Sequence, residues 1–347
     1  MTASPRKGRV AIGLIGLGRL GRVYARDLAA RIPETRLVAV SDPVGSLAKD
    51  VAEEFDVPKH YADPLAMIDD ANVEALVIVS PTHTHRDIVL ASAARRKPTF
   101  CEKPPALSLE EVDEMKQAIG RAGMFFQMGF MRRFDPGYAA AKREIDAGHI
   151  GAPLVFKSTS RDPFRPSLEY ANPKSSGGML IDMGIHDFDL ARWFMGDVKA
   201  ISAIGATIAY PELESVGDID NAVASLVFAS GKLGVIDLTR SGIYGYDIST
   251  EILGLEGTIR IGYLRETAIT VLKKNNVSHD TVPYFMERFR EAYTLQLQNF
   301  AQNVLHDREP PITIDDGLEA LRLGVAATRA QQTGHTVTVA DVTRVGV

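Results

Sequence analysis

The sequence has almost none of the features that mark a secreted or membrane-bound protein. It contains a single cysteine, Cys101, so no disulfide can form within the chain, as is typical of a reducing compartment. No apolar run approaches the roughly 20 residues that a membrane helix needs. The first ten residues, MTASPRKGRV, are basic but lack the apolar segment of a secretory signal. We therefore expect a cytoplasmic protein.

The chain also lacks a large excess of charge of either sign. Its formal net charge is −5, so there is no electrostatic basis for binding nucleic acid or an anionic membrane. With 45% hydrophobic and 24% charged residues it has the composition of a globular protein. Its 347 residues exceed what one typical core supports, so we expect two domains.

A dinucleotide-binding pattern opens the chain. The apolar run Val10 to Ile15 ends in GLGRLG, a helical pattern follows, and a second strand, Leu37 to Val40, leads to Asp42. In this fingerprint the first glycine forms the tight turn, the second lets the pyrophosphate approach the backbone, and the third lets helix and strand pack closely. Asp42 is placed to bind the adenosine ribose hydroxyls and to repel a 2′-phosphate. No basic residue follows before Lys49, which favours NAD over NADP.

Strands and helices then alternate as in a doubly wound parallel sheet. We expect a near-continuously apolar strand at Val73 to Val79 and shorter ones at His60–Tyr61, Pro98 to Cys101 and Met124 to Met128. The helices between them are expected at Leu47 to Phe55, Pro64 to Asp69, Arg86 to Arg95 and Ser108 to Ala122. These elements place a nucleotide-binding domain at residues 1–128.

Polar residues follow two of these strands. Ser80, His83 and His85 come directly after Val73 to Val79. A His-x-His pair could bind a metal, but no cysteine or acid cluster accompanies it, so we expect a loop beside the cofactor and no metal. The other strand leads into Glu102-Lys103-Pro104-Pro105, where a lysine could stabilise a developing alkoxide. The alternative for Glu102 and Lys103 is a surface ion pair.

The second half, residues 129–347, reads as a separate α+β domain. Several segments alternate with period 2, which indicates a large, mostly antiparallel sheet with one covered face. We expect its strands at Leu154 to Ser160, Ala200 to Ala209, Ala222 to Phe228, Leu233 to Leu238, Ser249 to Leu255, Thr258 to Ile261 and Ala268 to Leu272. Helices are expected at Asp135 to Ala147, Arg288 to His306 and Asp315 to Gln332. An open sheet face needs a cover, so self-association through the sheet is a reasonable hypothesis.

The stretch Gly177 to Gly196, GGMLIDMGIHDFDLARWFMG, is expected to be mostly helix. Asp182 and His186 are four residues apart, which would stack them on one helical face. A carboxylate beside an imidazole suits proton transfer near neutral pH. The alternative is a helix N-terminus that Asp182 caps, with His186 merely packed or solvated.

The glycine motif with Asp42, the Glu102-Lys103-Pro104 motif and the Asp182 to His186 segment together resemble the Gfo/Idh/MocA oxidoreductase family. GFMRRFD at Gly129 to Asp135 and YGYD at Tyr244 to Asp247 are similar to inositol 2-dehydrogenases. The resemblance implies a Rossmann domain joined to an α/β domain with an open antiparallel sheet. It also implies NAD as cofactor and a homodimer or homotetramer assembled through that sheet.

The resemblance also implies the roles of individual residues. Lys103, Asp182 and His186 match the catalytic residues: His186 as general base, Asp182 orienting substrate or imidazole, and Lys103 donating to the reacting oxygen. The expected cofactor contacts are Gly16, Gly18, Arg19, Leu20, Gly21, Asp42, Ser80, His85, Glu102 and Lys103. The expected substrate contacts are Lys103, Met131, Arg132, Asp162, Asp182, His186 and Tyr246.

One departure bears on the substrate. The closest inositol dehydrogenase pattern has His-Arg-Asn-Pro where this chain has Ser160-Arg161-Asp162-Pro163. The expected reaction is oxidation of a ring hydroxyl of myo-inositol or an isomer. The alternatives are scyllo-inositol, a pyranose or a 3-keto sugar on the same fold, an NAD-binding sensor without catalysis, and a metal-dependent hydrolase using His83 and His85.

Overall fold

The computed structural model describes residues 8–342, which form two compact units. The first unit runs up to Met131 and also takes in Glu291–Leu318; the second comprises Arg132–Arg290 and the chain from Glu319 onward. The first seven residues of the segment that we expect to lack a secretory signal lie outside the described residues. No helix within the described part is long and apolar enough to cross a membrane.

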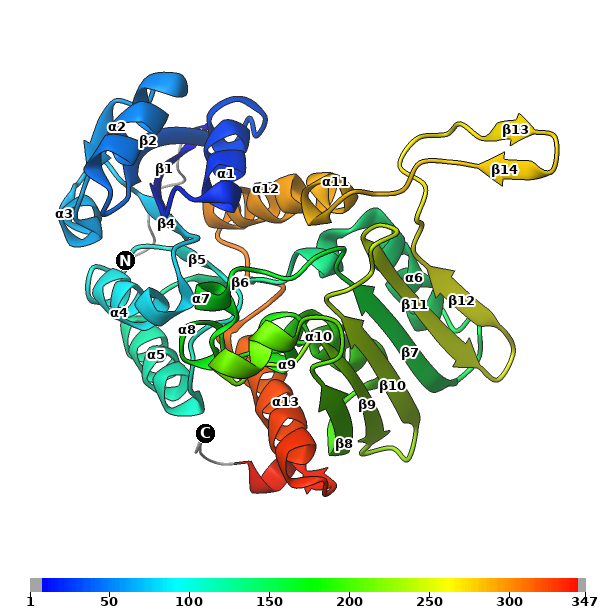
Figure 1. Cartoon of the computed structure of the whole chain (residues 1–347). Coiled ribbons are helices and arrows are strands. Elements are labelled where there is room, and N and C mark those ends of the chain that lie inside the picture. The colour runs from blue at the N-terminus through cyan, green and yellow to red at the C-terminus, as the bar shows by residue number, and fades with distance from the viewer. Residues whose placement is uncertain (1–7, 343–347) are drawn as a thin grey trace. The chain divides into compact units, whose positions relative to one another are not determined.

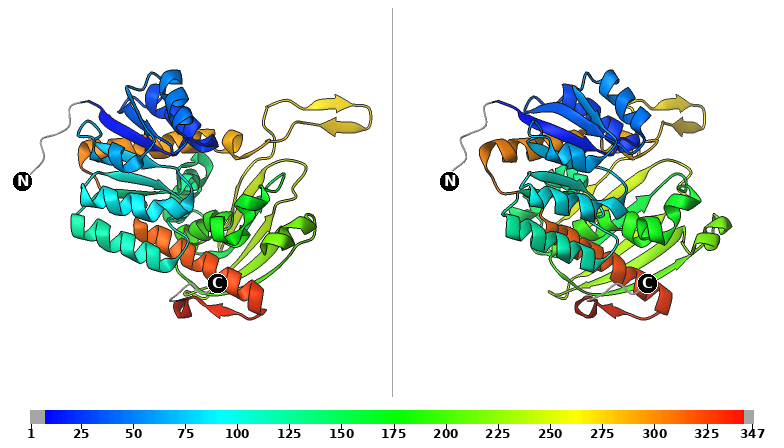
Figure 2. Two further views of the ribbon diagram at one scale, coloured as in Figure 1. Left: turned by 60° about the vertical axis from the view of Figure 1, so that its left-hand side comes forward. Right: turned by 90° about the vertical axis from the view of Figure 1, so that its left-hand side faces the viewer.

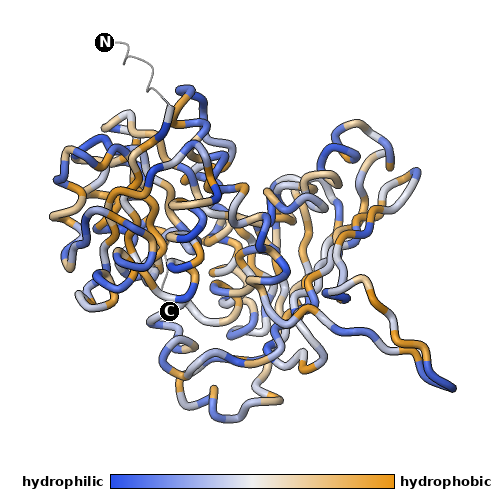
Figure 3. The backbone as a smooth tube through the Cα atoms, turned by 90° about the horizontal axis from the view of Figure 1, so that it is seen from above, coloured by the Kyte–Doolittle hydropathy of each residue, from blue (hydrophilic) through white to orange (hydrophobic). Residues whose placement is uncertain are grey.

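The first unit is built on a six-stranded sheet in which every pairing is parallel (Figure 1). The strand order is β3-β2-β1-β4-β5-β6, with the chain turning back at β1 and β4. The strands are β1 (Val10–Ile15), β2 (Thr35–Ser41), β3 (Lys59–Tyr61), β4 (Ala75–Ile78), β5 (Thr99–Glu102) and β6 (Phe126–Gly129). Strands β1 and β4 are buried along their whole length, and Figure 3 shows hydrophobic segments at the centre of this unit.

Helices connect these strands and cover the sheet. They are α1 (Arg19–Ala30), α2 (Gly45–Glu54), α3 (Pro64–Asp69), α4 (His85–Ala94) and α5 (Leu109–Ala122), with a short 3₁₀ turn η1 (Thr82–Thr84) and the late helix α12 (Arg290–His306). The Phe100 ring contacts Tyr24 of α1 and Phe300 of α12, so both helices pack on one face. Helices α4 and α5 run side by side in both views of Figure 2 and share the Arg86–Glu114 ion pair.

The second unit carries a seven-stranded sheet of order β12-β11-β7-β10-β9-β8-β15 (Figure 1). Only β7 and β10 pair in parallel; the other pairings are antiparallel, so the predicted fold class is confirmed. The strands are β7 (Pro153–Arg161), β8 (Val198–Ala206), β9 (Asn221–Phe228), β10 (Leu233–Thr239), β11 (Asp247–Gly254), β12 (Thr258–Ile261) and β15 (Val337–Thr338).

The helices of this unit include several single turns. They are η2 (Met131–Phe134), α6 (Pro136–Asp146), α7 (Leu168–Ala171), α8 (Pro173–Ser176), α9 (Met179–Asp182), α10 (Ile185–Met195), η3 (Pro211–Val216), α11 (Phe285–Arg288), α13 (Ile314–Thr333) and η4 (Val339–Asp341). The long helix α13 passes from the first unit to the second at Leu318. The expected boundary between the two functional domains, after residue 128, remains a prediction. The compact first unit is larger than the expected nucleotide-binding domain, because it also includes Glu291–Leu318.

One sequence-based expectation for this unit is wrong. The strand expected at Ala268 to Leu272 does not join the large sheet: β13 (Val271–Lys273) pairs only with β14 (Asn276–Ser278), in a hairpin that extends away from that sheet (Figure 1). The stretch Gly177 to Gly196 is mostly helical, as expected, but in two pieces: α9 ends at Asp182 and α10 begins at Ile185.

Candidate active site

The glycine loop after β1 has the shape that a dinucleotide requires. Gly16 has a φ of +92°, and a Cβ there would lie 2.5 Å from the backbone nitrogen of Ser80. A Cβ on Gly21 would lie 2.1 Å from the Gly16 carbonyl oxygen, whereas one on Gly18 would meet nothing within 4 Å. The outer two glycines therefore serve close packing within the chain. The space beside Gly18, which is the N-cap of α1, fits a pyrophosphate approaching the helix N-terminus.

Asp42 lies against the same loop, directly after β2. Its Oδ2 accepts a hydrogen bond from the Leu17 backbone N–H at 3.0 Å, and its Oδ1 accepts one from the Val44 N–H at 2.9 Å. The carboxylate is thereby fixed beside the turn where an adenosine ribose would lie. Arg19 and Leu20 are the first two residues of α1; Arg19 is exposed and Leu20 is partly buried. Their contacts to the cofactor remain predictions.

His85 joins two loops of the first unit. Its side chain is buried, with Nδ1 2.9 Å from the Pro104 carbonyl oxygen and Nε2 2.8 Å from the Ser80 carbonyl oxygen. A neutral imidazole can donate to only one of these acceptors. Burial lowers the pKa of His85 although both carbonyls favour the charged form. The ring is therefore an internal link between the loop after β4 and the loop that carries Lys103.

His83 gives no support to a metal site. It is exposed in the turn η1, and the neighbouring His85 ring has both nitrogens at backbone carbonyls. No group of three or more potential metal-ligating side chains occurs between residues 8 and 342.

Glu102, the last residue of β5, has its side chain in the interior of the first unit. Tyr24 and Gln296 both donate to its Oε1, the amide at 3.1 Å, and the Lys103 backbone N–H donates to its Oε2 at 3.2 Å. Burial raises the pKa of Glu102. Burial is also the largest of the causes that raise the pKa of Tyr24. These bonds fix the peptide beside Lys103, and a direct contact between Glu102 and the cofactor remains a prediction.

The break between α9 and α10 lies at Gly184. The Met179 carbonyl oxygen accepts from both Met183 N–H and Gly184 N–H, which closes α9. The next turn starts afresh, with the N–H groups of Asp187 and Phe188 donating to the Gly184 carbonyl. Asp182 is thus the last residue of one helix and His186 the second residue of the next. The expectation of a shared face on one continuous helix is wrong.

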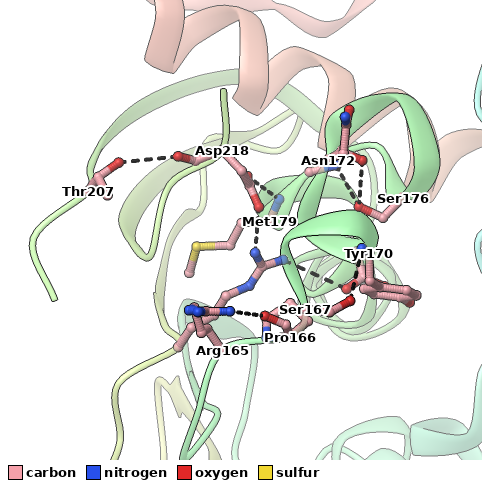
Figure 4. Close-up of polar contacts among 12 residues, drawn as sticks. Arg165, Pro166, Ser167, Tyr170, Asn172, Ser176, Met179, Thr207 and Asp218 are labelled. Carbon is pink, nitrogen blue, oxygen red and sulfur yellow. Dashed lines mark hydrogen bonds and ion pairs between the residues drawn. The ribbon is translucent and has the colours of Figure 1, made fainter. Parts of the chain in front are cut away.

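Asp182 belongs to a polar cluster that the sequence alone did not reveal, and Figure 4 shows three other members of it, Tyr170, Met179 and Asp218. The Tyr170 hydroxyl donates to its Oδ1 at 2.9 Å, and Arg240 Nη2 lies 3.9 Å from its Oδ2. Arg240 Nη1 also donates to Asp218 Oδ2, and Asp218 Oδ1 accepts from the Met179 N–H at the start of α9. The charge of Asp182 raises the pKa of Tyr170, and this phenol donates to Asp182 at neutral pH.

A second buried cluster, around Asp187, fixes the start of α10. Asp187 directly follows His186 in the sequence. Asp187 is fully buried and accepts from Arg132 Nη1 at 2.8 Å and from the hydroxyl of Ser158. Ser160 Oγ lies 2.8 Å from Asp187 Oδ2 and also accepts from Arg132 Nη2 at 3.1 Å. Two of the three Arg132 nitrogens are therefore engaged within the chain. Its role as a substrate contact remains a prediction.

The other expected substrate contacts lie in separate places. Met131 is buried at the end of the first unit. Asp162 follows β7, where its N–H donates to the Thr239 carbonyl at 2.8 Å. Tyr246 is buried and packs edge-on against Tyr284, and its pKa is raised by burial and by the charge of Asp162. Asp162 and Tyr246 both belong to the second unit.

The sequence carried some signal for the side chains that were missed. Asp187 directly follows His186, and Arg240 directly follows the apolar strand β10. A lone arginine at the end of a buried strand requires a counter-charge. The identity of that counter-charge, Asp218, depends on the fold.

Comparison with known proteins assigns both halves of the chain. Residues 10–130 match the family described as "Oxidoreductase family, NAD-binding Rossmann fold", and residues 142–339 match "Oxidoreductase family, C-terminal alpha/beta domain". Both are the Gfo/Idh/MocA descriptions. The expected family and its NAD-binding domain are confirmed.

Individual relatives are similar over nearly the whole chain. The scyllo-inositol 2-dehydrogenase (NAD(+)) of Bacillus subtilis is 41% identical over 97% of this chain and 98% of its own length. The Myo-inositol 2-dehydrogenase of Thermotoga maritima is 39% identical, over 95% and 99%. The crystal structure of scyllo-inositol dehydrogenase from Lactobacillus casei, with bound NAD(H) and scyllo-inositol, superimposes with a TM-score of 0.91. It is 32% identical and covers 96% of this chain and 99% of that one.

Proposed function

Because this chain belongs to the Gfo/Idh/MocA oxidoreductase family, we propose that it is an NAD-dependent dehydrogenase of a cyclic polyol, myo-inositol or an isomer. The observation that carries the proposal is full-length similarity to relatives named for both myo- and scyllo-inositol. The glycine loop supports it, because the open space at Gly18 and the fixed carboxylate of Asp42 suit a dinucleotide. Oxidation occurs at a ring secondary hydroxyl.

The proposed chemistry divides between the cofactor and three side chains. Bound NAD accepts a hydride from the carbon that carries the reacting hydroxyl. His186 takes the hydroxyl proton as general base. Asp182 orients the substrate or the imidazole and stabilises the imidazolium, and Lys103 donates to the reacting oxygen and stabilises its developing charge.

The surroundings of these residues support the assignment. Lys103 follows a peptide held by the buried Glu102, and His85 fixes the Pro104 carbonyl. His186 precedes Asp187, which is anchored in the second unit. We further propose that Met131, Asp162 and Tyr246 contact the polyol.

We propose that the protein is a homo-oligomer, a dimer or tetramer, assembled through the large sheet. Exposed apolar side chains pair across strands on one face: Ile204 lies opposite Val223 and Val227 opposite Leu233, with Ser225 between them on β9. Such a row favours association over exposure to water. Sedimentation of the wild type and of Leu233→Lys tests this; a monodisperse monomer for the wild type would contradict it.

The activity is tested by absorbance at the NADH band with purified protein and NAD. The panel is myo-, scyllo- and D-chiro-inositol, glucose, galactose and xylose, repeated with NADP. We expect turnover of an inositol with NAD. Activity on pyranoses alone would change the function to that of a sugar dehydrogenase. Silence with all substrates, while NAD still binds, would contradict the proposal and favour the reductase direction or an NAD sensor.

His186→Ala tests the role of His186 as general base. Loss of the general base should lower kcat by about 10²–10⁴-fold, while calorimetric NAD affinity stays nearly unchanged. A variant that lost NAD binding but kept turnover would overturn the assignment of His186.

A further inference from the structure

The position of Asp182 depends on groups outside its own helix. Helix α9 has only four residues, and a single helical turn has almost no stability of its own. Its first N–H, on Met179, donates to Asp218 Oδ1 at 2.9 Å, and Asp182 is its last residue. Asp218 in turn pairs with Arg240, whose other terminal nitrogen lies 3.9 Å from Asp182. The Asp218–Arg240 pair therefore contacts both ends of this helix.

The charges of this cluster explain why Arg240 is directed at Asp182. Its side chain is 1% exposed and that of Asp218 is 4% exposed, so the pair is shielded from water. Within residues 8–342, Arg240 Nη2 has no hydrogen-bond partner, and Asp182 Oδ2 lies at ion-pair distance from it. A buried guanidinium with one satisfied side gains from a second carboxylate. Asp182 provides that carboxylate.

The remaining oxygen of Asp182 is held by Tyr170. Its hydroxyl donates to Oδ1, so the two carboxylate oxygens face two different groups. Contacts on both oxygens restrict the orientation of the Asp182 carboxylate.

The support of Arg240 is itself rigid. Its backbone N–H donates to the Asp220 carbonyl at 2.9 Å, directly after β10. The buried Asp220 carboxylate accepts from the N–H groups of Ile208, Ala209 and Tyr210 at 2.6 to 2.8 Å. Arg240 thus projects from a strand end and a loop that are both fixed, as an effective positioning group requires.

We propose that Arg240 and Tyr170 are positioning residues that hold the Asp182 carboxylate in its working orientation. This inference rests on the proposed function, in which Asp182 is catalytic. A displacement of about 1 Å in a catalytic group can cost roughly 10²-fold in rate. Arg240→Met should therefore lower kcat by about 10- to 100-fold and leave the KM for NAD unchanged, because the glycine loop is not altered. Tyr170→Phe should lower kcat by several-fold.

A double-mutant cycle tests whether Arg240 acts through Asp182. We expect Arg240→Met to lower the residual kcat of an Asp182→Asn enzyme by less than twofold, far less than in the wild type. Equal factors in both backgrounds would overturn the proposal. Arg192→Met removes an arginine whose partner Asp197 is largely exposed, and it should leave kcat unchanged. Tyr170→Phe gives the same test if Arg240→Met does not fold, since Tyr170 is about half exposed.

A second measurement is independent of turnover. In protein labelled with ¹³C at aspartate carboxyl groups, Asp182→Asn identifies the Asp182 resonance. That resonance should move in Arg240→Met and in Tyr170→Phe but not in Arg192→Met. An unmoved resonance would overturn the proposal, whereas a moved resonance in a protein with no dehydrogenase activity would contradict only the proposed function.

Discussion

Asp187→Asn should be among the most destabilising single changes in the second unit. Asp187 and Arg132 are 0% and 2% exposed, and their ion pair is joined by two serine hydroxyls. The substitution keeps the shape of the side chain but leaves the Arg132 guanidinium buried without its counter-charge. Removing one partner of such a pair typically costs about 3–5 kcal/mol. We expect a loss of that size.

The single tryptophan of the chain offers a local probe of this loss. Trp193 lies on α10, six residues after Asp187, and its ring contacts the Arg133 guanidinium. Urea titration followed by Trp193 emission should therefore report the unfolding of this region. With an m-value of about 3 kcal/mol per molar urea, the expected loss shifts the midpoint by about 1 to 2 M.

The control is Asp197→Asn, which removes the largely exposed partner of Arg192 on the same helix. An exposed pair contributes at most about 1 kcal/mol, so its midpoint should move by much less. If Asp187→Asn shifts the midpoint no further than Asp197→Asn does, the buried pair does not anchor α10 and the reasoning fails.

Three further predictions concern the first unit. Asp42→Ala should raise the KM for NAD by about tenfold to a hundredfold, because the variant loses roughly 1.5–3 kcal/mol of charged hydrogen bonds. It should also reduce the preference for NAD over NADP. An unchanged ratio of kcat/KM for NAD to kcat/KM for NADP would contradict this role of Asp42. Gly18→Ala should leave the free energy of unfolding within about 1 kcal/mol of wild type but weaken NAD binding in calorimetry. Gly21→Ala should instead lower the denaturation temperature, because its Cβ would meet the Gly16 carbonyl. Because burial lowers the pKa of His85, the unfolded chain binds more protons than the folded one below about pH 6.5, so stability falls as the pH drops through this range. His85→Gln should flatten that fall in calorimetric scans between pH 7.5 and 5.5, and the exposed His83→Gln should not.

Local sequence signals predicted most of the first unit because each of its elements carries its own pattern. Helix α3 begins and ends where expected, at Pro64 and Asp69, since proline favours the first helical turn. Ser108 caps α5, at the residue where this helix was expected to begin, and forms a capping box with Glu111. The roles of the three glycines also agree with the space around each one.

The second unit was harder to predict because its site depends on contacts between distant segments. The apolar spacing continues across Gly184, so periodicity alone gives no sign that the helix is interrupted there. Two contacts of Asp182 come from residues 12 and 58 positions away, Tyr170 and Arg240. The fold decides which distant segments lie beside α9, and no local pattern reveals that.

The parallel pairing of β7 with β10 has a consequence for synthesis of the chain. Val155 of β7 is paired with Leu233, which the ribosome adds 78 residues later. At about 5–20 residues per second, β7 waits roughly 4 to 16 s for this neighbour. Its other neighbour, β11, is made later still. The segment with Asp182 and His186 is synthesised during that interval. The edges of β7 meanwhile lack a partner strand and remain open to chaperones and to other nascent chains.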